Sequence, residues 1–101
     1  MRRGTTPAIT LTVDYDITAW TVYVTLRNGG NVLTLTNDAL TMTYQNQKTT
    51  IALALTQEQT LAFAVGSCEV QVRAIHDGTA IATNIEKLDV KRILKDGVID
   101  E

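Results

Sequence analysis

Residues 20–36 read WTVYVTLRNGGNVLTLT, and this stretch decides the fold class. Apolar and polar residues alternate on both sides of Asn28–Asn31, a run that tolerates the positive φ angles of a tight hairpin. In the first half, the face predicted to point inward carries Trp20, Val22, Val24 and Leu26. Alternation with this period is typical of half-buried antiparallel strands, so the stretch predicts two strands joined by a hairpin.

The same two-residue period recurs along most of the chain. It appears in residues 8–13, 32–36, 40–44, 50–56, 68–76, 79–84 and 86–94. Threonine, which suits a pleated and half-exposed surface, occurs 17 times, and Asp77–Gly78 is a strong hairpin signal. Seven or eight short strands with turns at this spacing predict an all-β fold, an antiparallel β-sandwich.

Residues 56–66, TQEQTLAFAVG, interrupt this period. Thr56 and Gln59 match a helix capping box, and Gly66 stands where a helix would end. We therefore expect one short helical turn near residues 57–64, with Leu61 and Phe63 inserted into the core.

The stretch after the Asp77–Gly78 turn is ambiguous. Residues 86–94 alternate as a last strand with Leu88 and Val90 inward, but Ile81, Ile85 and Leu88 would also suit one face of a helix. We expect a single sandwich domain over residues 1–94, with residues 95–101 as a C-terminal tail or terminal strand.

Composition narrows the class of protein. A formal net charge of −2 gives no clustered cationic surface for nucleic acid, so no nucleic-acid partner is expected. A single cysteine, Cys68, excludes an intrachain disulfide and fits a protein folded in a reducing cytoplasm. The first ten residues lack the apolar run of a signal peptide, and no stretch approaches the roughly 20 apolar residues of a membrane span. No membrane partner is expected.

No residue is predicted to be catalytic, to bind a cofactor or to hold a metal. His76 directly precedes a turn, which predicts a surface residue, and Cys68 has the inward parity of a buried, inert thiol. One histidine and one cysteine do not supply the usual four ligands of zinc. Asp14 and Asp16 favour a solvated turn, because the later glycine and glutamate of a calcium loop are missing. We expect a protein that is not an enzyme.

Three stretches together carry a family resemblance. They are MRRGTTPAITLTV at residues 1–13, LTQEQTLAFAVGSCEVQVRAI at residues 55–75 and ATNIEKLDVKRILKDGVIDE at residues 82–101. The chain resembles small structural proteins of phages and prophages of Gram-positive bacteria, in particular the immunoglobulin-like N-terminal domain of siphophage upper baseplate proteins. The resemblance implies an immunoglobulin-like sandwich and a non-enzymatic virion, tail or baseplate component. Its expected partners are other virion proteins or itself, as a homo-oligomer, and its expected location is the virion.

The segment KRILKDGVIDE, residues 91–101, places two apolar pairs around an Asp-Gly turn signal. Terminal segments are usually polar and frayed unless something holds them. The residues expected to make protein contacts are Ile93, Leu94, Val98 and Ile99. Such a segment can add a strand either to its own sheet or to the exposed sheet edge of a partner, and both alternatives stay open.

Two other functions remain open from the sequence. A glycan- or host-receptor-binding module would need exposed aromatic rings, but Trp20 has the parity of a core residue and only Tyr23 has the opposite parity on the same strand. One tyrosine does not make a sugar platform. The remaining alternative is a small phage-encoded inhibitor of a host protein.

Overall fold

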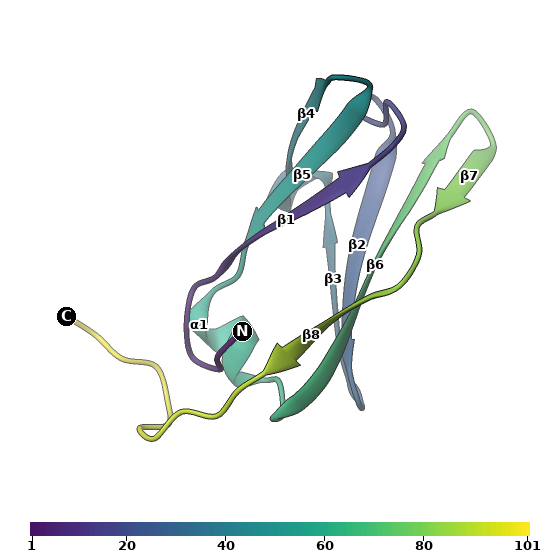
Figure 1. The fold of residues 1–101 in the computed structure, drawn as a ribbon. Coiled ribbons are helices and arrows are strands. Elements are labelled where there is room, and N and C mark those ends of the chain that lie inside the picture. The colour runs from purple at the N-terminus through teal and green to yellow at the C-terminus, as the bar shows by residue number, and fades with distance from the viewer.

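The computed structural model describes residues 1–101 and consists of two antiparallel sheets that face each other (Figure 1). The strands are β1 (Ala8–Val13), β2 (Thr21–Asn28), β3 (Asn31–Thr36), β4 (Thr41–Gln45), β5 (Lys48–Ala54), β6 (Gly66–His76), β7 (Thr79–Ala82) and β8 (Glu86–Val90). A 3₁₀ helix η1 (Asn37–Ala39) and a short helix α1 (Gln57–Leu61) complete the fold. The predicted all-β sandwich is confirmed, whereas η1 was not predicted. No helix is long and apolar enough to cross a membrane.

The sheet order is that of an immunoglobulin-type sandwich. One sheet has the order β4-β5-β1, and the other has the order β3-β2-β6, with β7 and β8 both paired to the outer edge of β6. These orders correspond to strands D-E-B facing strands C′-C-F-G of an immunoglobulin domain. The arrangement leaves β1 and the β7–β8 segment as edges on the same side of the sandwich (Figure 1).

The core is built from the inward faces that the alternation predicted. Its buried residues are Val13, Ile17, Val22, Val24, Leu26, Leu35, Ile51, Leu53, Leu55, Phe63, Cys68, Val70, Val72, Ala74 and Val90. Each fully buried Val or Leu side chain contributes roughly 1.5–3 kcal/mol, so this cluster dominates the stability of the fold. Trp20 was predicted to share this face, but it precedes β2 by one residue and lies half-buried at the rim of the core.

Helix α1 confirms the predicted capping box. The Thr56 hydroxyl accepts from the Gln59 N–H at 3.1 Å, and the Gln59 side chain accepts from the Thr56 N–H at 2.9 Å. Phe63 is buried as expected, but Leu61 is only half-buried. Gly66 was wrongly predicted to end the helix. The helix ends at Leu61, and Gly66, with a φ of 137°, opens β6 instead.

The last strands confirm the alternation and exclude the helical alternative. Ala82 pairs with Arg73, and Glu86 pairs with Val70. Between these two pairs the chain advances by four residues along β7–β8 but by only three along β6. The extra residue is a bulge, which shifts the inward parity by one position. Ile81 on β7 and Leu88 on β8 therefore both pack against the core despite their odd separation. Strand β8 ends at Val90, short of the predicted end at residue 94.

The two ends of the sandwich carry different features (Figure 1). The loop end holds the β1–β2 loop, the β4–β5 turn and the β6–β7 turn. The terminal end holds the N-terminus, α1 and the C-terminal segment, residues 91–101, which forms no strand. Its single sheet-like contact is a parallel bridge between Lys91 and Arg2.

Candidate functional site: an open edge of the sandwich

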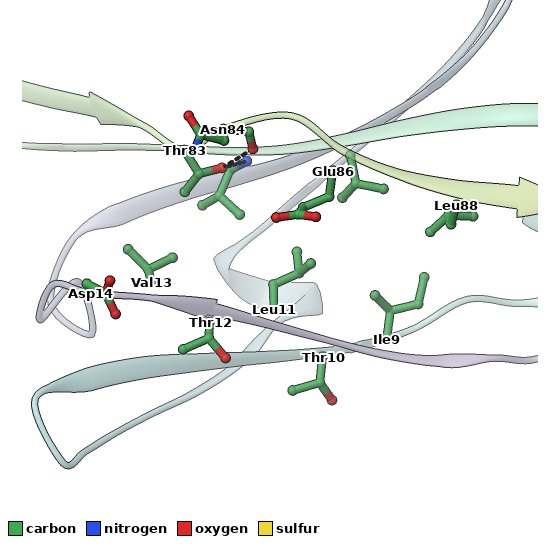
Figure 2. Close-up of a pocket in the computed structure, with 12 residues that line it drawn as sticks. Ile9, Thr10, Leu11, Thr12, Val13, Asp14, Thr83, Asn84, Glu86 and Leu88 are labelled. Atoms are coloured by element: carbon green, nitrogen blue, oxygen red, sulfur yellow. Dashed lines mark hydrogen bonds between the residues drawn. The ribbon is translucent and has the colours of Figure 1, made fainter.

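A groove runs between β1 and the β7–β8 segment, where the two sheets are not closed against each other (Figure 2). It measures about 550 Å³ and is lined by Ile9, Thr10, Leu11, Thr12, Val13, Asp14, Val70, Val72, Thr83, Asn84, Glu86 and Leu88. Figure 2 shows Ile9, Leu11 and Val13 pointing toward the β7–β8 segment, whereas Thr10 and Thr12 point away from it. Ile9 and Leu11 have core parity but remain half-buried, because nothing covers this side of β1.

The backbone of β1 is free along the same groove. Strand β1 pairs only with β5, in the register Ala8↔Ala54 to Val13↔Thr49. Every second residue of an edge strand presents an N–H and a C=O that no neighbour binds, and such an edge is a template for another strand. The groove therefore combines a free hydrogen-bonding edge with an incompletely covered apolar floor.

The charges at the groove have one sign. Its charged lining residues are Asp14 and Glu86, with no lysine or arginine among them. Lys48 lies 3.8 Å from Asp14, but both side chains are largely exposed, so solvent screens this pair. An extended segment that carries apolar and basic side chains would be complementary to this surface.

The four residues of the C-terminal segment that were predicted to make contacts differ in their burial. Ile93 is half-buried against its own domain, and a Cβ added at Gly4 would come within 2.9 Å of Ile93 Cδ1. Leu94 is 93% exposed, and Val98 and Ile99 are also exposed. Ile93 therefore packs against its own domain, while Leu94, Val98 and Ile99 expose apolar surface to solvent.

Contacts with the terminal end hold the segment in place. The Arg3 guanidinium donates to the Phe63 and Leu61 carbonyls at 2.7 and 2.8 Å and lies 3.6 Å from the Asp96 carboxylate. The Gln57 side-chain amide donates to the Ile99 carbonyl at 3.2 Å and accepts from its N–H at 2.9 Å. One side chain thus occupies both backbone groups of Ile99 that a partner strand would use.

The residues considered as catalytic or metal-binding candidates lie in the environments that the sequence predicted. His76 is exposed at the end of β6, and Asp16 accepts from the Thr18 N–H and hydroxyl in a solvated turn. Cys68 is buried. Burial raises the pKa of the Cys68 thiol above its ordinary value and the Glu69 charge adds to this, while a hydrogen bond with the Arg27 backbone opposes it. A thiol that resists ionisation is a poor nucleophile.

Sequence reasoning missed two features that depend on distant contacts. Asn28 was interpreted as a turn residue, but it is the buried last residue of β2, and its amide binds the Ala64 and Ser67 backbone. Tyr15 and Tyr44 line one depression at the loop end although they lie far apart in the chain. No local pattern marks either feature.

The fold by itself assigns no function, because immunoglobulin-type sandwiches serve many unrelated purposes. Comparison with protein-family models and with curated proteins finds no significant match. The groove, the C-terminal segment and the loop end are the features from which function is inferred.

Proposed function

We propose that this protein is a non-enzymatic structural protein of a phage or prophage virion, a tail- or baseplate-type component that acts through protein–protein contacts. The open edge at β1 carries the proposal, since it offers unpaired backbone above an apolar groove. The resemblance to the immunoglobulin-like N-terminal domain of siphophage upper baseplate proteins supports the assembly role. On this proposal the chain is made in the bacterial cytoplasm and ends in the virion.

The partner we propose for the groove is the C-terminal segment of a second copy. Leu94, exposed on one copy, lies in sequence between the basic residues Arg92 and Lys95. The groove offers an apolar floor flanked by the acidic Asp14 and Glu86. The apolar residues of the segment match the apolar floor, and Arg92 and Lys95 match the acidic flanks, whereas Asp96 in the same segment carries the opposite charge.

The lengths also agree. Strand β1 has six residues and spans about 20 Å at 3.3 Å per residue, and residues 94–99 in extended form span the same length. The groove and the segment are different surfaces of one molecule, and we propose that each copy binds one neighbour with its groove and another with its segment, rather than exchanging segments with a single partner. Such head-to-tail contacts generate rings or filaments, which suits a virion component.

The test is the solution mass of the purified protein, measured by light scattering over a wide concentration range. We expect the mass to rise with concentration toward a discrete oligomer, and Leu94→Asp to shift it back toward the monomer. Val32→Asp is the control, because Val32 is also an exposed apolar residue and lies on the far edge strand β3. A wild-type protein that stays monomeric at every concentration contradicts self-assembly.

A charge exchange tests the docking site itself. Glu86→Lys and Lys95→Glu should each weaken association, since each places like charges across the proposed contact. The double variant should regain association, because the opposite charges then face each other again. Failure of the double variant to recover would show that the segment docks elsewhere.

A further inference from the structure

A second depression lies at the loop end, among residues of the β1–β2 loop, β4 and the β4–β5 turn. Figure 1 shows these segments at the end of the sandwich opposite the C-terminal segment. Tyr15 of the β1–β2 loop and Tyr44 of β4 flank it, with 56% and 46% of their surface exposed. The other lining residues are Asp14, Asn46, Gln47 and Lys48. Its volume of about 550 Å³ falls within the range of small-ligand sites. Four of the six lining side chains are polar, so the depression does not suit an apolar ligand.

The exposed Tyr15 ring is held in place. It meets Trp20 edge-on with ring centroids 5.9 Å apart, and Trp20 in turn stacks on His76 at 5.6 Å. The fully buried Thr49 hydroxyl donates to the Tyr15 carbonyl and accepts from the Ile17 N–H, which anchors the loop backbone on both sides. A ring that is both exposed and fixed loses little conformational entropy when a ligand stacks on it.

The polar side of the depression is also fixed. Asn46 and Gln47 form the two-residue turn between β4 and β5, with φ angles of 54° and 64°. The left-handed region is unfavourable for glutamine, and glycine would occupy it without steric cost. The turn therefore presents two carboxamides beside Tyr44, with Asn46 in a region that asparagine adopts readily and Gln47 in one that glutamine adopts rarely.

We propose that the loop end binds a neutral pyranose saccharide. The rings of Tyr15 and Tyr44 offer the negative faces that attract the C–H groups on the apolar side of a sugar ring. The carboxamides of Asn46 and Gln47 both donate and accept, so they match the paired donor and acceptor character of neighbouring sugar hydroxyls. The two charged lining residues, Asp14 and Lys48, have opposite signs, so the depression has no net formal charge and favours a neutral sugar over an anionic one.

Asp14 lines both this site and the groove, but the aromatic and carboxamide groups of this site lie outside the groove between β1 and β8, so the two proposals rest on different side chains. A virion component with both features would assemble through one surface and hold a cell-surface sugar through another. Either proposal can fail without the other.

The first experiment applies the purified chain to an array of neutral oligosaccharides built from glucose, galactose, rhamnose and N-acetylglucosamine. Binding to the best glycan is then titrated by the fluorescence of Trp20, the only tryptophan, which contacts Tyr15 directly. We expect Tyr15→Ala and Tyr44→Ala each to weaken binding about five- to tenfold, the magnitude of one aromatic contact. Tyr23→Ala is the matched control, because Tyr23 is an exposed tyrosine on the outer face of β2.

A further variant separates binding from folding. Gln47→Gly relieves the left-handed φ and should raise the melting temperature, yet it removes a carboxamide and should weaken glycan binding. The proposal is overturned if the wild-type chain binds no neutral glycan on the array. It is also overturned if Tyr23→Ala weakens binding as much as Tyr15→Ala does.

Discussion

The Thr83 hydroxyl accepts a hydrogen bond from the Val72 N–H at 3.1 Å, while the Thr83 N–H donates to the Val72 carbonyl at 2.9 Å. Thr83 therefore makes both hydrogen bonds that a paired strand residue would make with Val72. Its hydroxyl accepts from the Val72 N–H in the place where a backbone carbonyl would normally do so. The Gln71 amide donates to the Thr83 carbonyl at 2.9 Å and completes the junction. These hydrogen bonds keep β7 and β8 on the same edge of β6 although the register against β6 shifts by one residue between them. Thr83 also lines the groove.

Thr83→Val should therefore lower the free energy of unfolding by about 1–3 kcal/mol, since it leaves the Val72 N–H without an acceptor in a partly buried place. Urea denaturation measures this loss, and Thr83→Ser should recover much of it. Thr21→Val serves as the control, because Thr21 is exposed on β2. Its effect should stay within about 0.5 kcal/mol. Equal losses for Thr83→Val and Thr21→Val would argue against a special role for the Thr83 hydroxyl.

Asn28→Asp should cost about 3 kcal/mol at neutral pH, because it removes two donors and places a carboxylate against the Ala64 and Ser67 carbonyls, both 3.0 Å from the amide nitrogen. Asn31→Asp, at the exposed partner position across the hairpin, should be nearly neutral. Thermal unfolding of both variants gives the comparison. A small effect at residue 28 would mean that the loop before β6 relaxes without this clamp.

Thr56→Ala should destabilise the fold by about 1 kcal/mol, since the N–H of Gln59 loses its acceptor at the start of α1. Thr56→Ser keeps the hydroxyl and should restore most of the loss. Chemical denaturation of the three proteins checks this order. Serine and alanine variants of equal stability would show that the cap contributes nothing here.

Gln57→Ala should release Ile99 without a large change in stability, because both hydrogen bonds of its amide lie at the surface. Amide hydrogen exchange at Ile99 should become faster. If the C-terminal segment docks on a second copy, the average mass by light scattering should also rise at a given concentration. Glu58→Ala, a neighbouring exposed change, should alter neither quantity. A fall in mass for Gln57→Ala would show that the segment associates from its folded-back position.

The raised pKa of Cys68 makes stability depend on alkaline pH. Because the folded thiol ionises less readily than the unfolded one, its stabilising effect is complete below the unfolded pKa of about 8.5 and is lost as pH rises through the folded value. The difference in unfolding free energy between the wild type and Cys68→Ala should therefore shrink from pH 8 upward. A thiol reagent should react slowly with the native protein and rapidly in denaturant, and fast native labelling would contradict the burial.

The sequence was sufficient for the elements whose causes are local. The period of two in residues 8–13, 21–27 and 68–76 placed strands and their inward faces correctly, since alternation along one strand reports directly which face is buried. The capping box at Thr56 was equally local, because both of its hydrogen bonds lie within one helical turn. Gly66 was misread because glycine serves the end of a helix and the start of a strand equally well.

Of the candidate surfaces, the sequence determined the apolar character of Leu94, Val98 and Ile99 and predicted their role as contacts. Only the tertiary structure decided that Ile93 packs against the domain, that β1 is left as an open edge, and that Tyr15 and Tyr44 line one depression. The reason is physical. Strand periodicity fixes which face of each strand is inward, but strand order and loop packing follow from contacts between residues far apart in the chain, and no local pattern encodes which strand is left at an edge.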